Sequence, residues 1–352
     1  MTPMARTLAA GATLAAALIL VSTPILAQRQ GQGDGNRPSR QCAREIAKLC
    51  GRDRSQIQAC LREKASELSS ECQSEMRARM QQRRQQASPH TGAFQRAVRP
   101  TRTVSFGEHQ RQQVDVYEPE GAVEPLPLVL FVHGGGWRMG SHERVQTKPA
   151  HFGAQEVYFA STGYRLLPDY PVEDQASDVG AAVQALVGQA GALGFDAERI
   201  VLMGHSAGAH LAALVATDPQ YAGEAFGAIK GVILLDGAGY DIAQNIEDAE
   251  FQTRRIYEDA FGFDEARRKA LSPIAHVGGP DAPNWLALYV AERASAKWQA
   301  EWLVNALTQA DRSARAVAIT GTDHGRMNRE IGVVAGKAQT EAIDAFLAEV
   351  FE

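Results

Sequence analysis

The sequence predicts an α/β protein with a mostly parallel, doubly wound sheet, preceded by a small disulfide-linked helical hairpin. From about residue 104 onward, short apolar β-rich runs alternate with helical segments, which is the pattern of a parallel sheet covered on both faces. Before that point, all four cysteines of the 352-residue chain fall between residues 42 and 72. Hydrophobic residues make up 45% of the chain and charged residues 22%, which is ordinary for a globular protein.

The chain begins with a segment typical of an export signal. Arg6 precedes a mostly apolar run over residues 8–21, and Ala27 supplies the small residue that signal cleavage requires. The run is short for a membrane-spanning helix and is interrupted by glycine, proline and polar residues. We therefore interpret residues 1–27 as a cleaved signal peptide and not as an anchor, which predicts a periplasmic or secreted protein. Residues 28–40, rich in Gln, Gly and Arg, are predicted to be a linker.

Cys42, Cys50, Cys60 and Cys72 predict two disulfides, because closely spaced cysteines in an exported chain usually form a cross-linked framework. In an antiparallel helical hairpin the nested pairing is geometrically natural, with the inner two cysteines joined near the turn and the outer two near the open end. Four cysteines permit three pairings, so the sequence favours this pairing without fixing it. The intervals are too long for the paired CxxC spacing of a zinc site.

Residues 41–80 are expected to form that hairpin. Helical patterns run over about residues 41–49 and 55–79, with Gly51 and Arg52 as the turn. A hairpin of this size buries little apolar surface, so the cross-links should supply much of its stability. Residues 81–103, rich in Gln, Arg and Pro, are predicted to be a second linker.

The sequence around these cysteines resembles one unit of the cysteine-rich repeat found in a Golgi glycoprotein. The resemblance covers about 35 residues and rests on Lys48-Leu49-Cys50, Ala59-Cys60-Leu61 and Leu68-Ser69-Ser70-Glu71-Cys72. Residues 28–86 carry 13 Lys and Arg against 7 Asp and Glu, whereas the whole chain has a formal net charge of -5. The basic hairpin is therefore a candidate to bind an anionic envelope polymer or protein. Nucleic acid is not an expected partner, because the rest of the chain is acidic.

Residues 104–352 are predicted to form one catalytic domain of alternating strands and helices. The strands are apolar and rich in β-branched and aromatic residues. The expected strands cover residues 114–117, 126–133, 157–164, 199–203, 231–235, 285–290 and 314–319, and the expected helices cover residues 172–190, a segment from 207, about 296–310 and about 334–350. The stretch 240–272 is polar, aromatic and helical in tendency, and we interpret it as a small lid.

A nucleophile is predicted directly after the strand over residues 199–203. Gly204-His205-Ser206-Ala207-Gly208 follows that strand and opens a helix, which is the context of a Gly-x-Ser-x-Gly elbow. The two glycines are needed because the turn brings backbone segments so close that a Cβ would clash. Ser206 is therefore the predicted nucleophile, at the positive end of a helix.

A glycine-rich loop after an earlier strand predicts oxyanion donors. In His133-Gly134-Gly135-Gly136-Trp137, the absence of side chains lets backbone N–H groups approach a substrate oxygen. Such donors stabilise the oxyanion of a tetrahedral intermediate by about 3 kcal/mol each. The predicted donors are the N–H groups of Gly135, Gly136 and Ala207. His133 is expected to shape the loop through hydrogen bonds and not to act as the base.

The base is predicted near the C-terminus. Thr320-Gly321-Thr322-Asp323-His324-Gly325 follows the last predicted strand, and His324 is the one histidine of nine that lies in such a loop before the final helix. His205 and His210 are five residues apart, so a helix would turn them to different faces. Neither a metal nor an organic cofactor is expected.

Taken together, these motifs resemble the α/β-hydrolase carboxylesterases. The resemblance rests on residues 133–137, Tyr164-Arg165-Leu166-Leu167-Pro168, residues 204–208 and Asp323-His324-Gly325, and it extends over about residues 104–350. The nearest branch is that of the hormone-sensitive-lipase-like and feruloyl-esterase-like enzymes. The resemblance implies an α/β-hydrolase fold and a triad in the chain order serine, acid, histidine. It further implies hydrolysis of short-chain or carbohydrate-linked acyl esters.

The acid is the least determined member of that triad. The resemblance places an Asp or Glu just after the strand that precedes the last one, here residues 285–290, and Glu292 is the carboxylate nearest to that point. Glutamate can fix the imidazole tautomer and stabilise the imidazolium as aspartate does, so Glu292 is the preferred acid. Asp236 and Asp241, which follow the preceding strand, are the alternatives.

The expected reaction is two-step acyl transfer on a small-molecule or carbohydrate ester. Two other interpretations stay open. Residues 204–210 also resemble the elbow of kynurenine formamidase, which would make the chain an arylformamidase. A catalytically weak hydrolase scaffold used for binding is the other interpretation, because the acid is uncertain. Trp137, Tyr240 and Trp298 are candidates to line the substrate pocket, and the oligomeric state is not determined by the sequence.

Overall fold

The computed structural model describes residues 39–51, 60–61, 64–77, 99–122 and 124–352. These divide into two compact units, one before residue 96 and one from residue 96 onward. The predicted signal peptide and most of both predicted linkers lie outside the described residues. In the described part of the chain, no helix combines the length and the apolar character needed to cross a membrane.

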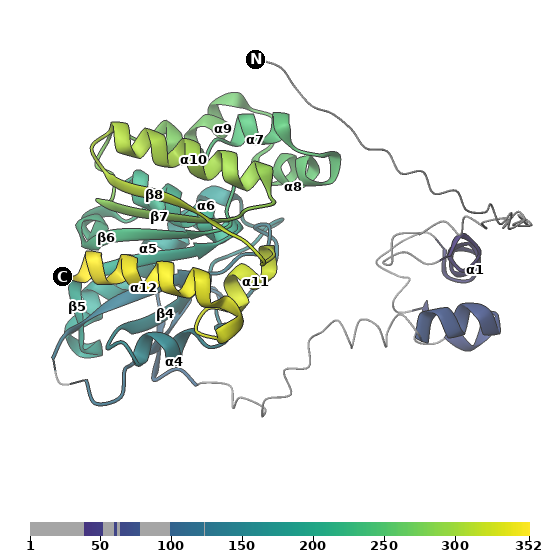
Figure 1. Ribbon diagram of the computed structural model, residues 1–352, viewed down its shortest axis with the longest axis horizontal. Coiled ribbons are helices and arrows are strands. Elements are labelled where there is room, and N and C mark those ends of the chain that lie inside the picture. Colours follow the sequence, from purple (N-terminus) through teal and green to yellow (C-terminus); the bar gives the residue numbers. More distant parts are fainter. Residues whose placement is uncertain (1–38, 52–59, 62–63, 78–98, 123) are drawn as a thin grey trace, which may run out of the picture. The chain divides into compact units, whose positions relative to one another are not determined.

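An eight-stranded sheet forms the centre of the larger unit (Figure 1). Its strands are β1 (Arg102–Ser105), β2 (Gln113–Tyr117), β3 (Leu126–Val132), β4 (Tyr158–Thr162), β5 (Phe195–His205), β6 (Ile229–Leu235), β7 (Asn284–Val290) and β8 (Ser313–Ile319). Their order across the sheet is β1-β2-β4-β3-β5-β6-β7-β8. The pairs β1–β2 and β2–β4 are antiparallel and the others are parallel. The predicted class, an α/β protein with a mostly parallel sheet, is confirmed; β1 is a strand that the sequence pattern did not predict.

Helices cover both faces of this sheet (Figure 1). The α-helices of the larger unit are α4 (Lys148–Gly153), α5 (Val172–Leu193), α6 (Ala207–Thr217), α7 (Ile242–Asp248), α8 (Phe251–Phe261), α9 (Glu265–Ala270), α10 (Ala294–Gln309), α11 (His324–Arg329) and α12 (Lys337–Phe351). One apolar cluster joins the sheet to α5, α6 and α10, and a second joins its other face to α4 and α12. Successive residues of a strand therefore alternate between two cores.

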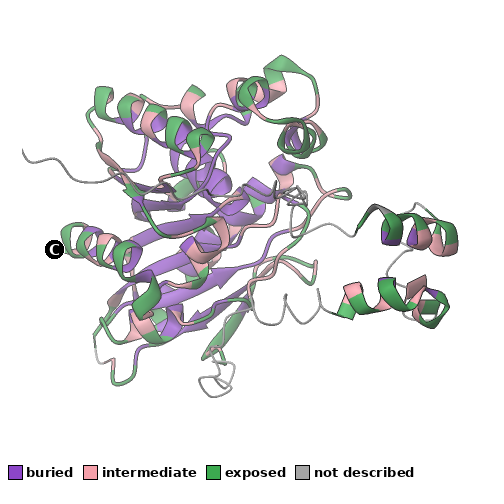
Figure 2. Cartoon of the chain, turned by 45° about the vertical axis from the view of Figure 1, so that its right-hand side comes forward, coloured by how far each residue is buried: buried purple, intermediate pink, exposed green. Residues whose placement is uncertain are grey.

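Strand β3 shows this alternation clearly. Leu128 and Leu130 belong to the cluster with α5 and α6, whereas Val129 and Phe131 belong to the cluster with α4 and α12. Each of these four side chains is at most 1% exposed. Figure 2 shows the same concentration of buried residues on the strands, with exposed residues on the outer faces of the helices. A strand buried on both faces reads in the sequence as a continuous apolar run, which is why these strands were predictable.

The parallel strands end at one edge of the sheet, and the predicted motifs follow those ends. Val132 at the end of β3 is level with Gly204, and His205 at the end of β5 is level with Leu235. Backbone hydrogen bonds continue past the strand ends, from Ser206 N to Leu235 O (3.1 Å) and from Asp236 N to Leu288 O (2.7 Å). In open α/β sheets this edge is where ligands bind.

The smaller unit contains two disulfides, Cys42–Cys72 and Cys50–Cys60. This confirms the nested pairing. The first helix is α1 (Arg40–Cys50), close to its predicted bounds. The prediction of one continuous helix over residues 55–79 is wrong, because the backbone of Leu68 is extended (ψ 155°) and a new helix follows it over residues 70–77.

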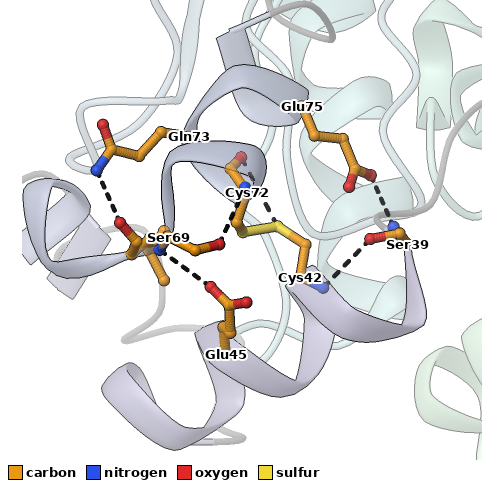
Figure 3. Close-up of a disulfide and its surroundings, with 8 residues drawn as sticks. Ser39, Cys42, Glu45, Ser69, Cys72, Gln73 and Glu75 are labelled. Atoms are coloured by element: carbon orange, nitrogen blue, oxygen red, sulfur yellow. Dashed lines mark hydrogen bonds between the residues drawn. A yellow bond between two sulfur atoms is a disulfide. The ribbon is translucent and has the colours of Figure 1, made fainter.

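Two Ser-x-x-Cys-x-x-Glu sequences, starting at Ser39 and Ser69, connect the helices of this unit (Figure 3). In each, the serine hydroxyl accepts a hydrogen bond from the N–H of the cysteine three residues later, at 3.2 Å in both cases. Each glutamate accepts a hydrogen bond from the N–H of the other serine, at 2.7 Å for Glu75 and 3.1 Å for Glu45. The hydrogen bonds from Ser69 lower the pKa of Glu45. A helix cap on each side of the Cys42–Cys72 disulfide is thus completed by a carboxylate from the other helix.

The structure predicts that the Cys42–Cys72 disulfide holds this unit together. Among the described residues of this unit, the buried apolar core is small: it consists of Cys42, Ile46, Leu68 and Cys72, with partly buried residues around them. The double variant Cys42→Ser, Cys72→Ser is expected to lose roughly 3–4 kcal/mol of stability in this unit, the range for closing a loop of this length. Limited proteolysis of the full chain, with cleavage sites mapped by mass spectrometry, should show faster cutting within residues 39–77 and unchanged protection after residue 104. Equal protection of both forms would contradict this prediction.

Candidate active site

Ser206 lies in the sharp turn between β5 and α6. Its backbone is left-handed, with φ 56° and ψ -119°. A Cβ on Gly204 would lie 2.2 Å from the carbonyl oxygen of Gly208, and a Cβ on Gly208 would lie 2.1 Å from the carbonyl oxygen of Val132. Both positions therefore require glycine, for the reason expected from the sequence. Non-glycine residues in such sparsely populated conformations cluster at functional sites.

His324 lies against Ser206 at the start of α11. Its Nε2 is 3.0 Å from Ser206 Oγ. The carboxylate of Asp323 caps α11 by accepting hydrogen bonds from the N–H groups of Gly325 and Arg326, at 2.9 and 2.8 Å. This cap explains why aspartate precedes the histidine in the motif, since it fixes His324 as the first residue of the helix.

His205 supports the loop that carries His324. The ring nitrogen Nε2 of His205 lies 2.8 Å from the carbonyl oxygen of His324, and a carbonyl oxygen can only accept a hydrogen bond. Burial, together with the nearby charge of His324, lowers the pKa of His205 to about 3. His205 is therefore neutral near pH 7, and its single N–H donates a hydrogen bond to the carbonyl oxygen of His324.

Asp236 is the carboxylate that contacts His324. Its Oδ2 lies 2.7 Å from His324 Nδ1, and its Oδ1 accepts a hydrogen bond from Val290 N at 2.9 Å. Asp236 directly follows β6 with φ 48° and is 1% exposed. Burial raises the pKa of Asp236, but the hydrogen bonds from His324 and Val290 N–H and the charges of Arg293 and His324 outweigh burial and hold it below its ordinary value.

The preference for Glu292 as the acid is corrected by this geometry. Glu292 is exposed in the turn between β7 and α10, and in the described part of the chain it makes no hydrogen bond to His324. Asp241 has a different task, because its side chain caps α7 by accepting a hydrogen bond from Gln244 N at 3.0 Å. The carboxylate beside His324 therefore comes from the end of β6. The left-handed backbone of Asp236 turns its side chain toward the end of β7, where Val290 N–H donates a hydrogen bond to it.

Arg293 stands beside the point where the sequence analysis expected the acid. Its Nη1 donates hydrogen bonds to the Oδ2 and, at 3.3 Å, to the carbonyl oxygen of Asp236, and it lies 2.8 Å from His324 Nδ1. The side chain of Arg293 is 35% exposed, whereas that of Asp236 is 0% exposed. The sequence contained no signal for this contact, since an arginine after a strand is more often a surface residue.

Three unpaired backbone donors lie beside Ser206: two belong to the glycine-rich loop, and the third is the N–H of Ala207 at the start of α6. Gly135 and Gly136 have φ of 136° and 59°, and a Cβ on Gly135 would lie 2.0 Å from the carbonyl oxygen of Met139. Within the described residues, no group accepts a hydrogen bond from the backbone N–H of Gly135, Gly136 or Ala207. These N–H groups are free to bind the oxygen of a ligand.

Buried residues hold this loop in place. The Tyr164 hydroxyl donates a hydrogen bond to the carbonyl oxygen of His133 (2.7 Å), and the two rings stack with centroids 4.3 Å apart. Burial lowers the pKa of His133 to about 4, so this imidazole is neutral. The carbonyl oxygen of Trp137 accepts hydrogen bonds from Leu167 N and Gln175 Nε2, each at 3.0 Å.

The stretch 240–272 forms α7, α8 and α9, and α8 contacts the glycine-rich loop. The ring of Trp137 packs edge-on against Tyr257 and Phe261, with centroids 5.2 and 4.8 Å apart. Tyr240 is also buried, whereas Trp298 is 39% exposed and packs against Trp302 on α10. Of the three aromatic residues considered for the pocket, only Trp137 belongs to the loop beside Ser206.

Two further contacts join α8 to the same loop. Arg138 and Asp259 form an ion pair, with Nη2 and Oδ2 3.2 Å apart. Ile256 Cγ2 lies 3.6 Å from the position that a Cβ on Gly136 would occupy. The helix is therefore held over the loop from which two of the three free N–H groups come.

Solved structures of similar architecture include Thermogutta terrifontis esterase 2. The complex of that enzyme phosphonylated by sarin superposes with a TM-score of 0.61 at 21% sequence identity, covering 71% of this chain and 94% of the other. The propionate-bound form gives a TM-score of 0.58 at 22% identity, with the same coverage. The chain has the α/β-hydrolase fold.

Sequence comparisons point to esterases over part of the chain. Residues 114–227 match the family model described as BD-FAE. The chain is 33% identical over 168 residues to the probable isoprenylcysteine alpha-carbonyl methylesterase ICME of Oryza sativa subsp. japonica, covering 46% of this chain and 40% of the relative. It is 35% identical over 118 residues to carboxylesterase NlhH of Mycobacterium tuberculosis, covering 33% and 36%. It is also 30% identical over 151 residues to kynurenine formamidase of Danio rerio, covering 42% and 50%. The chain thus spans about half or less of the length of the curated relatives that it matches.

The geometry predicts that Asp236, and not Glu292, supports the reactivity of Ser206. Asp236→Asn is expected to slow labelling of Ser206 by a fluorophosphonate at least about tenfold, because the neutral amide neither fixes the reactive tautomer nor stabilises the imidazolium. Glu292→Gln, an exposed neighbour in the next turn, is the matched control and should label at the wild-type rate. The opposite ranking of these two variants would restore Glu292 as the acid.

Proposed function

We propose that this chain is a serine hydrolase that cleaves carboxylic esters through an acyl-enzyme intermediate. The observation that carries the proposal is the hydrogen-bond chain from Ser206 through His324 to Asp236, beside three unpaired backbone N–H groups. The matches to a methylesterase and a carboxylesterase support esters as the substrate class. A binding scaffold without activity would not need these groups at hydrogen-bonding distance.

In the proposed mechanism, His324 donates its Nδ1–H to Asp236, which leaves Nε2 free to accept the proton of Ser206. The serine oxygen attacks the ester carbonyl, and the N–H groups of Gly135, Gly136 and Ala207 stabilise the oxyanion. The imidazolium of His324 then protonates the leaving alcohol. Water, deprotonated by the same imidazole, releases the acid and regenerates Ser206.

The surroundings of the loop favour small or short-chain esters. Ile256 lies over Gly136, and the Arg138–Asp259 ion pair and the packing of Trp137 hold its helix there. We infer that a long acyl or alcohol group bound beside Gly136 would meet this side chain. We therefore prefer short-chain esters as substrates, with carbohydrate-linked acyl esters of similar size as the second option.

We further propose that the enzyme acts outside the cytoplasm. The two disulfides of the smaller unit support this, because such cross-links form and persist in oxidising compartments. The export signal at residues 1–27 lies outside the described residues and stays a prediction. The binding of an anionic polymer or protein by the basic hairpin also stays a prediction.

Hydrolysis of p-nitrophenyl acetate and butyrate by the wild type and by Ser206→Ala tests the proposed function. The wild type should turn over both esters, and the variant should lose at least about three orders of magnitude in kcat because it lacks the nucleophile. N-formylkynurenine, assayed in parallel, separates the formamidase alternative suggested by the Danio rerio match. A folded wild type that hydrolyses none of these substrates would contradict the proposal.

The position of Ile256 predicts a change in chain-length preference. Ile256→Ala should raise kcat/KM for p-nitrophenyl octanoate relative to the acetate by about fivefold to tenfold, because each methylene admitted into a pocket is worth about 1 kcal/mol or more. Phe251→Ala removes a side chain from the same helix that is 75% exposed, and should leave the ratio unchanged. An equal change in both variants would show that the side chain of Ile256 does not set the chain length.

A further inference from the structure

The carboxylate of Asp236 is shared between two partners. Its Oδ2 accepts hydrogen bonds from both Arg293 Nη1 and His324 Nδ1, while its Oδ1 is occupied by Val290 N–H. The other titratable groups near this carboxylate are His205 and Tyr240. Burial lowers the pKa of His205 to about 3 and raises that of Tyr240 well above its ordinary value, so both are neutral near pH 7. The charge balance of Asp236 therefore depends on Arg293 and His324.

Arg293 and Asp236 both contact Nδ1 of His324, but one is a hydrogen-bond donor and the other an acceptor. Arg293 Nη1 lies 2.8 Å from Nδ1, and Asp236 Oδ2 lies 2.7 Å from the same atom. A neutral imidazole either carries its proton on Nδ1 and donates to Asp236, or lacks that proton and accepts from Arg293. Only the first tautomer leaves Nε2 able to take the proton of Ser206. The second places a proton on Nε2 and removes the base.

The charge of Arg293 also opposes the reaction. Proton transfer from Ser206 turns His324 into a cation, which Asp236 stabilises and Arg293 repels from nearly equal distances. The guanidinium does not lose its charge in proteins, so this repulsion is present throughout the cycle. Asp236 without Arg293 would still be held by Val290 N–H and by the imidazole.

We propose that Arg293 is a positioning residue that restrains the base: it competes with His324 for the carboxylate of Asp236. Catalysis then runs more slowly than the serine, histidine and aspartate alone would support. This inference rests on the proposed serine hydrolase function. It concerns a residue that does not touch the reacting atoms and acts only through Asp236 and His324.

A double-mutant cycle on p-nitrophenyl acetate hydrolysis separates this role from a purely structural one. Arg293→Met is expected to raise kcat about threefold to tenfold with KM nearly unchanged, because the restraint on the base is lifted. Asp236→Asn should lower kcat strongly, since it leaves the cation of Arg293 unopposed beside His324. The combined variant should be more active than Asp236→Asn alone. A lower kcat in Arg293→Met, without rescue of Asp236→Asn, would overturn the proposal.

Two matched variants control the cycle. Arg293→Lys keeps a cation at the site and should raise kcat less than Arg293→Met does. Glu292→Gln changes the exposed neighbour without touching Asp236 and should leave kcat unchanged. Should Arg293→Met fail to fold, Arg293→Gln removes the charge but keeps an N–H donor that can still bind Asp236, so a smaller increase in kcat is expected. An unchanged kcat in the folded neutral variant would overturn the proposal.

Proton NMR of the full chain gives a readout that does not depend on turnover. An imidazole Nδ1–H bonded to a carboxylate resonates far downfield, and this His324 signal should move further downfield in Arg293→Met because the carboxylate is no longer shared. Identical signals in the wild type and in Arg293→Met would contradict the inference. If the wild type hydrolyses no ester, the proposed function fails in the activity assay, whereas the NMR comparison still decides whether Arg293 competes for Asp236.

Discussion

The close approach of Gly208 to the end of β3 is the constraint on which the rest of the site depends. Because Gly208 has no side chain, α6 can begin directly beside the carbonyl oxygen of Val132, and the turn that contains Ser206 becomes left-handed. That turn lies against the glycine-rich loop, which begins at the residue after Val132, because a Cβ on Gly134 would lie 3.0 Å from Ser206 Cβ. One missing Cβ thus brings the proposed nucleophile and the proposed oxyanion donors together. Any larger residue at 208 would separate them.

The sequence predicted the parallel sheet and most of its covering helices because these elements are buried on both faces, and burial leaves a strong apolar signal. It also indicated Ser206, His324 and the glycine-rich loop, since each depends on a local pattern of glycine, a strand end or a helix cap. It did not predict the break before Ser69, because helical residues flank it on both sides. That break depends on a contact across the hairpin, the Glu45 carboxylate on Ser69 N–H, which no local pattern reveals.

The sequence favoured Glu292, and not Asp236, as the carboxylate beside His324 for a related reason. A resemblance gives an expected position along the chain, but the reach of a side chain is decided by backbone conformation and by neighbouring strands. Asp236 follows β6, one strand earlier than expected, and its left-handed φ together with the N–H of Val290 carries its carboxylate to His324. The place beside the end of β7 is then filled by Arg293, whose charge compensates a carboxylate that is otherwise buried. The two departures from the expected pattern are therefore coupled.

Burial also distinguishes His324, the proposed base, from three other histidines near this edge. His133, His205 and His210 are each at most 9% exposed, and burial lowers their pKa values to about 4, about 3 and about 4. They remain neutral and form hydrogen bonds with backbone carbonyl oxygens: His133 with Gly134, His205 with His324, and His210 with Leu271. His324, with 41% of its side chain exposed, can be reached by a substrate and by water. The proposed base is thus distinguished from these three histidines by exposure, and the hydrogen bond of His205 to the His324 carbonyl oxygen helps to keep it in line with Ser206.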